Sequence, residues 1–353
     1  MANDINFELL KRLCETPGIP GREDALSAVV HEELSGLVDS VTTDRLGNVI
    51  GVRAGQGGPK VMFAAHMDEI GFIVKHIDDN GFIRIHPVGG FDARVLPAQR
   101  VIVHGFSGEQ LLGGIALESK PIHLLAGDEA KPPKVEQLFV DIGLPGERVK
   151  ELVEVGDMVT LLGSVERVGD NVMGKSFDDR ICIFLMLEAL RALGDERTNA
   201  ELVAVATTQE EVGLRGARTS AFHVEPDVGV ALDITLAMDI PGAAPQDAVT
   251  RLGDGVAIKL MDSSHISDHR LVRHFRQLAR DHDIKHQLEI LPRGGTDAGA
   301  MQLSRGGVIA IPISLPTRYV HTVNESASIA DIRAAIALLA AYMRHAQDGD
   351  YLN

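Results

Sequence analysis

The chain has 353 residues, of which 45% are hydrophobic and 24% charged, the composition of an ordinary globular protein. Its 50 acidic and 34 basic residues give a formal net charge of −16, which argues against nucleic acid and anionic membranes as partners because both attract basic surfaces. The length is large for one hydrophobic core, so we expect two domains. Cys14 and Cys182 lie far apart in apolar contexts and are expected to be buried free thiols in a reducing compartment.

The first part of the chain has an α/β pattern. Apolar spacing predicts helices over 6–15 and 23–37, and the Leu46-Gly47-Asn48 turn within 41–52 predicts a β-hairpin. The apolar run 60–65 predicts a buried strand, and His66 and Asp68 follow at its carboxyl end.

The first residues carry no basic region followed by an apolar core, and no apolar run is long enough to span a bilayer. We therefore expect a cytoplasmic protein.

From 71 to 163 the pattern changes to short alternating runs separated by glycine and proline. Such runs predict an all-β unit, and we expect a small barrel with a short helix near 134–138. Because α/β segments flank this unit, we predict an inserted domain at 70–163 and a catalytic domain formed by 1–69 and 164–353.

The α/β pattern then resumes with an apolar helix at 181–193. Buried strands are predicted at 202–206, 228–232, 255–260, 287–291 and 308–313. Helices are predicted at 267–281, from about 300 and at 329–346, and the tail 347–353 is expected to be frayed. The predicted fold class is α/β, a mixed central sheet flanked by helices, with an inserted small β-barrel.

Two adjacent glutamates, Glu210 and Glu211, come shortly after the predicted strand at 202–206. Neighbouring carboxylates repel each other unless a cation or a proton separates their roles. One of them would bind a metal while the other moves protons. Taken alone, the pair is explained as well or better by two solvated glutamates in a turn.

Other candidate ligands lie at or just beyond the ends of predicted elements. They are His66 with Asp68, Asp178 with Asp179, Asp233, and His321. Each alone has an ordinary explanation, such as helix capping, an Asx-turn or packing. Together they bring imidazole and carboxylate to the edge of an α/β sheet, where ligand sites form. That donor set suits Zn²⁺, Co²⁺ or Mn²⁺, and its size favours two ions that share a bridging carboxylate.

Five blocks of the chain, in order and over nearly its whole length, resemble the signature blocks of the TET aminopeptidases. The blocks are the segments 64–72, 174–180, 208–217, 294–299 and 319–322. Members of that family are dinuclear metal exopeptidases that assemble as tetrahedral dodecamers, and some carry endoglucanase labels. The resemblance implies a zinc-exopeptidase-like catalytic domain, with a PDZ-like dimerisation domain where the β unit is inserted.

The resemblance implies a ligand role for each matching residue. Asp178 would bridge two divalent ions. His66 and Asp233 would complete one site, and Glu211 and His321 would complete the other. Zn²⁺ is the expected metal, with Co²⁺ and Mn²⁺ as alternatives.

The same resemblance implies the residues that move protons and support the ligands. Glu210 would be the general base, Asp68 would hold the His66 imidazole, and the Asp178–Asp179 peptide would be cis. From the residues themselves, Gly295, Thr296 and Asp297 are candidates to line the substrate pocket, with a helix-capping loop as an equal alternative. Arg318 and Tyr319 either contact substrate or brace the His321 loop. His265 could face the site, although a surface position is the simpler expectation.

The predicted function is a dinuclear metal aminopeptidase that trims short peptides from the N-terminus, built as a homo-dodecamer from dimers. A metal-dependent deacylase on N-acyl compounds would use the same ligands. A glycosidase needs a carboxylic acid pair without metal and leaves the two histidine blocks without a role. A non-catalytic scaffold has no need of Glu210. Side-chain preference, the physiological metal and the peptide length limit stay open.

Overall fold

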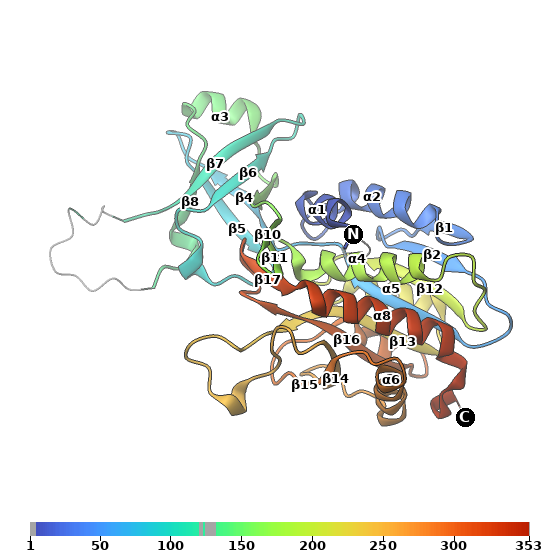
Figure 1. Ribbon diagram of the computed structural model, residues 1–353. Helices are drawn as coiled ribbons and strands as arrows, with labels where there is room; N and C mark the ends of the chain where they lie inside the picture. Colours follow the sequence, from blue (N-terminus) through green and yellow to red (C-terminus); the bar gives the residue numbers. More distant parts are fainter. Residues whose placement is uncertain (1–4, 120–122, 124–131, 353) are drawn as a thin grey trace.

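The computed structural model describes residues 5–119, 123 and 132–352, and it shows a helix-covered sheet with a small barrel beside it (Figure 1). Within these residues the large sheet has 11 strands, and six further strands close into a barrel in the order β4-β5-β8-β7-β6-β9. The predicted fold class is therefore confirmed. The predicted boundary of the inserted domain stays a prediction, and 120–122 and 124–131 lie outside the described residues.

The α-helices of the described chain are α1 (Phe7–Glu15), α2 (Asp24–Ser35), α3 (Gly146–Leu152), α4 (Phe177–Ala192), α5 (Arg215–Val224), α6 (His269–Asp281), α7 (Asp297–Gln302) and α8 (Ile329–His345). The helices predicted in the α/β segments are confirmed to within a few residues. Asp268 and Ser328 accept hydrogen bonds from the first turns of α6 and α8, as expected of N-caps. The apolar pattern does not predict α3 or α5. In α5 small side chains, including Ala217 and Ala221, form much of the buried face.

The strands of the large sheet are β1 (Ser40–Thr43), β2 (Val49–Arg53), β3 (Lys60–His66), β10 (Glu166–Val168), β11 (Asn171–Gly174), β12 (Glu201–Thr207), β13 (Val228–Leu236), β14 (Val256–Met261), β15 (His286–Ile290), β16 (Ile309–Arg318) and β17 (Glu325–Ser328). The predicted hairpin is present as β1 and β2. Strands β12, β3, β13 and β16 are neighbours and run parallel. Their carboxyl ends therefore meet at one edge of the sheet.

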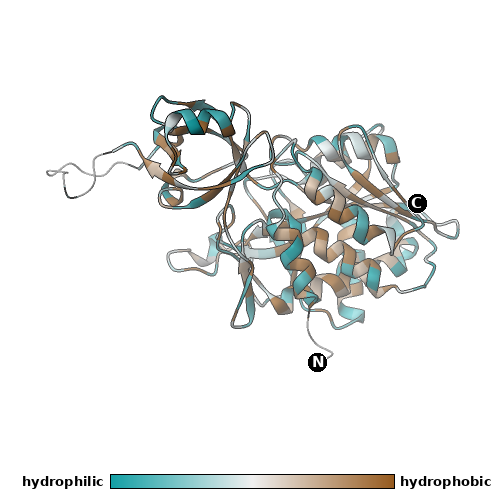
Figure 2. Ribbon diagram, turned by 90° about the horizontal axis from the view of Figure 1, so that it is seen from above, coloured by the Kyte–Doolittle hydropathy of each residue, from teal (hydrophilic) through white to brown (hydrophobic). Residues whose placement is uncertain are grey.

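Strand β3 shows how the sheet is packed between two layers of helices. Val61 and Phe63 face the core that includes α1, α4 and α8, whereas Met62 and Ala64 face the core that includes α5 and α7. This alternation is the two-residue period of a strand, and burial on both faces explains the continuous apolar run. Figure 2 shows both apolar and polar residues on the helices, as expected when each helix buries one side.

The barrel strands are β4 (Gly71–Ile77), β5 (Ile83–Val88), β6 (Arg100–His104), β7 (Gln110–Leu117), β8 (Leu138–Asp141) and β9 (Met158–Leu161). Their inward side chains, such as Phe72, Val101 and Val159, form a hydrophobic cluster separate from those of the large sheet. Near 134–138 the chain forms only the 3-10 turn η3 (Val135–Gln137) before β8 begins. The expected short helix is therefore a single turn.

The C-terminal tail is packed against the core, so the prediction of a frayed tail is wrong for its described residues. Tyr351 is 1% exposed, and its hydroxyl donates to the Ala346 carbonyl at 2.6 Å and lies 3.1 Å from the Tyr342 hydroxyl. Residue 353 lies outside the described residues.

Cys14 and Cys182 are buried free cysteines, as predicted. In the part of the chain that the structure describes, no helix combines the length and apolarity needed to cross a membrane.

Candidate active site

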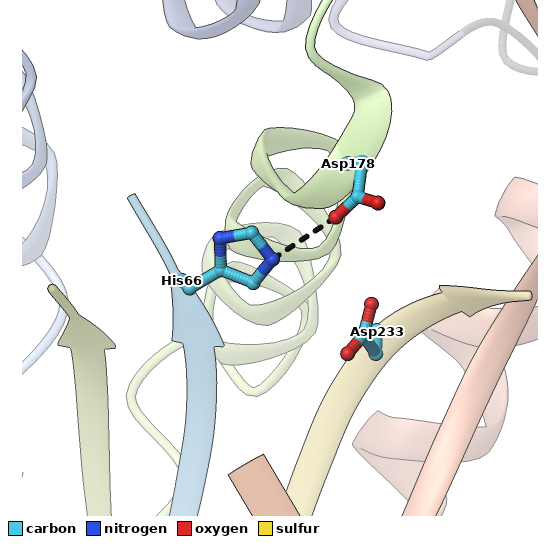
Figure 3. A group of neighbouring side chains, drawn as sticks. All are labelled: His66, Asp178 and Asp233. Atoms are coloured by element: carbon cyan, nitrogen blue, oxygen red, sulfur yellow. Dashed lines mark hydrogen bonds and ion pairs between the residues drawn. The ribbon is translucent and has the colours of Figure 1, made fainter. Parts of the chain in front are cut away.

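Two of the predicted ligands lie on neighbouring parallel strands. His66 is the last residue of β3, and Asp233 lies within β13, which continues to Leu236 instead of ending at the expected position. Ala231 of β13 pairs with Ala64 of β3, so the alternation of side chains puts Asp233 and His66 on the same face of the sheet. In Figure 3 both side chains point into one space, toward Asp178 at the start of α4.

Asp178 lies between two imidazoles. Its Oδ1 is 3.0 Å from His66 Nε2, and its Oδ2 is 3.1 Å from His321 Nε2. His321 Nε2 is also 3.2 Å from Glu211 Oε1. The side chains form three groups in each of which the potential ligand atoms lie within 4.8 Å of one another: His66 with Asp178 and Asp233, His321 with Asp178 and Glu211, and His66 with Glu210 and Glu211. Asp178 belongs to the first two groups.

The chemistry of this donor set fits divalent cations. Imidazole nitrogens and carboxylate oxygens in groups of three match the ligands of Zn²⁺ and related ions. Burial raises the pKa of Asp233 well above its usual range, and the charge of Asp178 adds to the effect. Burial also raises the pKa of Glu211, against the opposing hydrogen bond with His321. Positive charge between these carboxylates would keep them ionised.

The carboxylates around the two imidazoles favour the positively charged form of each ring. Burial alone would lower the pKa of His321, but the hydrogen bonds with Asp178 and Glu211 outweigh it and raise the pKa to about 12. Hydrogen bonds with Asp178 and Asp68 act in the same way on His66 and raise its pKa well above the ordinary value. The pocket is therefore built to hold positive charge.

Asp68 is fully buried and holds the segment that carries the two glutamates. Its Oδ1 accepts the Glu210 backbone N–H at 3.0 Å, and its Oδ2 accepts the Glu211 N–H at 3.0 Å. The Asp68 carbonyl oxygen lies 3.0 Å from His66 Nδ1. Because a carbonyl can only accept, Nδ1 carries the hydrogen, and Nε2 faces Asp178.

Glu210 lies beside the two groups that share Asp178 and belongs to the third group, with His66 and Glu211. Its Oε2 is 3.8 Å from His66 Nε2. Burial raises the pKa of Glu210 well above the ordinary value; His66 opposes this shift and Asp233 adds to it. Glu210 and ligand-bearing residues line a cavity of about 420 Å³, whose wall also contains Ile234 and Leu291. A cavity of this volume accommodates an amino-acid side chain.

The glycine-rich loop before α7 forms part of the same cavity. Gly295 and Thr296 line it. Asp297 is buried beneath them and accepts a hydrogen bond from Thr207 Oγ1 at 2.6 Å. Burial raises the pKa of Asp297 to about 6. The helix α7 begins at Asp297, three residues before the predicted start, because Thr296 caps it.

The other two candidate substrate contacts lie in a different setting. The Arg318 Nε donates to Asp239 Oδ1 at 2.9 Å, so its guanidinium is paired. Tyr319 is 48% exposed and has a φ of 61°, just before the His321 turn.

His265 is buried, with only 3% exposure, so the expected surface position is wrong.

A buried network holds the chain on both sides of the ligands. Lys175 Nζ lies 2.5 Å from Glu69 Oε2, and Arg180 Nη2 lies 3.4 Å from Glu69 Oε1. Arg180 also donates from Nε to the Met67 carbonyl at 3.0 Å and from Nη2 to the Gly18 carbonyl at 2.9 Å. The network therefore ties the segment after β3 to the start of α4. The Asp178–Asp179 peptide is cis, as expected.

Glu325, which no sequence pattern singled out, links the segments that carry Asp178 and His321. Its Oε1 accepts the His321 N–H at 2.7 Å, and its Oε2 accepts the N–H groups of Phe177 and Asp178 at 2.6 and 3.3 Å. Burial raises the pKa of Glu325 to about 8. Its position four residues after His321 is the one signal in the sequence that could have drawn attention to it.

A family model described as M42 glutamyl aminopeptidase matches residues 47–338. The chain belongs to the M42 glutamyl aminopeptidase family. It is 34% identical over 357 residues to the lysyl aminopeptidase of Pyrococcus furiosus, an alignment that covers 98% of this chain and 99% of that protein.

Two solved structures agree with this membership of the M42 family. An aminopeptidase from the archaeon Desulfurococcus kamchatkensis superimposes with a TM-score of 0.93 at 38% identity, covering 98% of this chain and 96% of that one. The TET1 peptidase of Pyrococcus horikoshii, described as assembling into a tetrahedron or a large octahedral shell, gives 0.86 at 30% identity, covering 96% of this chain and 98% of that one. The predicted resemblance to the TET aminopeptidases and the predicted enzyme class, a metallo-aminopeptidase, are confirmed.

Asp68→Asn should weaken Zn²⁺ binding by about 10–100-fold, because an amide nitrogen would face one of the two backbone N–H groups that the carboxylate now holds. Competition against a chromophoric chelator measures the affinity. Asp78→Asn is the matched control, since Asp78 accepts two backbone N–H groups in an exposed barrel turn. Equal affinity in the two variants would contradict the role of Asp68.

Proposed function

We propose that this member of the M42 family removes N-terminal residues from short peptides, with two divalent cations held by the two groups of ligands and Glu210 as the general base. The observation that carries the proposal is the position of Asp178, whose two carboxylate oxygens face His66 and His321 separately. A single carboxylate shared in this way suits a ligand that bridges two ions.

His66 and Asp233 would hold one cation, Glu211 and His321 would hold the other, and Asp178 would contact both. When bound, such ions supply Lewis acidity toward a water molecule and toward a peptide carbonyl. The mixture of nitrogen and oxygen ligands favours Zn²⁺, with Co²⁺ and Mn²⁺ as alternatives.

Glu210 would move the proton. Its carboxylate belongs to neither of the two groups that share Asp178, although it lies with His66 and Glu211 in a third group of potential ligands. Because the two proposed cations take their ligands from the groups that share Asp178, Glu210 would be left to take a proton from the attacking water and to deliver it to the leaving amine. The hydrogen bond from the Glu210 backbone N–H to Asp68 supports this role, because it limits where the Glu210 carboxylate can move.

The acidic surroundings support a substrate with a free amine. Four carboxylates line the cavity together with Lys259 and Arg293, and buried Asp297 and Asp68 add negative charge behind them. A positively charged N-terminus is attracted to such a pocket, whereas an N-acyl group gains nothing from it. This difference favours an aminopeptidase over the deacylase alternative.

The barrel would serve assembly. It has its own hydrophobic core and stands beside the sheet (Figure 1). We propose that barrels pair to form dimers and that dimers form a closed homo-dodecamer, an arrangement that would exclude folded proteins and admit peptides. A cytoplasmic location is part of the same proposal.

Glu210→Gln should keep cation binding and lower kcat by roughly 10²–10⁴-fold, because the amide can no longer accept a proton. Hydrolysis of aminoacyl-p-nitroanilides and the metal content of the purified variant are the two measurements. Glu201→Gln, at the opposite end of β12, is the control and should behave like the parent protein. A Glu210→Gln enzyme with the parent rate would show that the base is another residue.

Removal of metal should abolish activity, and addition of Zn²⁺ or Co²⁺ should restore it, because the ions would supply the Lewis acidity that lowers the pKa of the attacking water and polarises the carbonyl. The restored enzyme should cleave peptides with a free N-terminus and leave the same peptides untouched after N-acetylation. Faster cleavage of the acetylated peptides would favour the deacylase, and activity that survives exhaustive chelation would rule out the metal mechanism.

Native mass spectrometry should give a mass twelve times that of the 37.9 kDa chain, because the proposed shell contains that number of copies. A charge reversal on the outer barrel surface, such as Lys150→Glu, should shift the distribution toward smaller species if barrels pair there. A monomer at micromolar concentration would exclude a closed shell and the size selection that follows from it.

A further inference from the structure

The barrel reaches the active site through the Gly89–Gly90 link that follows β5, and Leu161 of β9 lies near the same ligands. Gly90 lies between β5 and the 3-10 turn η1 (Ala93–Val95). Its carbonyl oxygen accepts a hydrogen bond from His321 Nδ1 at 2.7 Å. A carbonyl has no hydrogen to donate, so Nδ1 must carry the hydrogen. The Nε2 atom is thereby turned toward Asp178 and Glu211.

Gly89 makes the second contact between the barrel and this group of ligands. Its φ is +91°, and a Cβ added there would lie 2.5 Å from Ile70 Cγ2 and 3.3 Å from Glu211 Oε2. The Gly89 backbone therefore packs directly against the Glu211 side chain, in a conformation that favours glycine. A larger residue could not occupy this position without displacing one of its neighbours.

The two groups of ligands differ in how they are supported. The His66 backbone and ring contact Asp68, Asp178, Asp179 and Glu210, which all belong to the sheet domain. In the other group, His321 and Glu211 each contact the barrel link. The backbone of His321 is held separately by Glu325, so the Gly90 carbonyl acts on the ring alone.

We propose that the Gly89–Gly90 link of the barrel is a positioning element for the cation site formed by Asp178, Glu211 and His321. The inference rests on the proposed dinuclear centre and goes beyond it, because it makes one of the two sites dependent on the barrel. The hydrogen bond to Gly90 sets the tautomer and orientation of the His321 ring, as partners of metal-binding histidines commonly do. The site formed by His66, Asp178 and Asp233 does not depend on the link.

The test compares two glycines of the same barrel with similar backbone conformations. Gly89→Ala introduces a methyl group against Ile70 and Glu211, whereas Gly108→Ala (φ +97°) has no neighbour within 4 Å of the added carbon. Both variants carry the same kind of backbone strain, so an effect of that strain alone appears in both. Isothermal titration of the metal-free full-length proteins with Zn²⁺ gives the stoichiometry and the two affinities.

The expected result is that the parent and Gly108→Ala bind two Zn²⁺ per subunit. Gly89→Ala should bind the first with parent affinity and the second about 10–100-fold more weakly. Two unchanged affinities in Gly89→Ala would overturn the proposal, and so would an equal loss at both sites. A parent protein that binds no divalent cation would instead contradict the proposed function, so the two failures are distinguishable.

A measurement on the parent protein keeps the proposal testable if Gly89→Ala does not fold. Solid-state NMR of the Zn²⁺-loaded protein labelled with ¹⁵N-histidine should show a protonated Nδ1 and a non-protonated Nε2 for His321, assigned by the loss of that signal in His321→Ala. The Nδ1 proton should show a short contact to the Gly90 carbonyl carbon. The opposite tautomer, with the hydrogen on Nε2, would overturn the proposal.

Discussion

The burial of like charges at the carboxyl edge of the sheet is the constraint on which the rest of the site depends. Burial raises the pKa values of Asp233 and Glu210 well above their ordinary range, so both carboxylates are costly to keep ionised. Protonation of the carboxylates or positive charge beside them offsets that cost. The carboxylates in turn raise the pKa values of His66 and His321, which favours charged imidazoles, and divalent ions would supply positive charge in the proposed enzyme.

Two further carboxylates, which are not proposed as ligands, accept hydrogen bonds from the backbone of the ligand segments. Asp68 accepts the N–H groups of both Glu210 and Glu211, and Glu325 accepts those of His321 and Asp178. Each therefore joins segments that are distant in sequence. Because the acceptors are buried, the segments they join lose freedom to move, and the ligands need little rearrangement to meet a cation. The barrel link adds a third support, through the His321 ring.

Local patterns account for the parts of the site that could be predicted. The apolar run of β3 ends at His66 because the next residues leave the buried sheet, and that boundary is visible in the sequence. Strand β13 is four residues longer than the predicted strand at 228–232. Its pairing with β16 continues to Leu236 opposite Thr317, and polar residues such as Asp233 within the run mask that continuation. Helix α7 begins three residues before its predicted start, because glycines before the Thr296 cap interrupt the helical pattern in the sequence.

The sequence by itself determined the residue types, the strand that presents His66 and the adjacency of two carboxylates, Glu210 and Glu211, shortly after a strand. These follow from period, apolarity and the chemistry of neighbouring side chains. Only the tertiary structure decided that Asp178 faces two imidazoles, that Glu325 holds two ligand segments, and that Gly90 reaches His321 across 231 positions of sequence. Such contacts depend on strand order and on where the barrel packs against the sheet, and no local spacing in the chain encodes a distance between segments that meet only after folding.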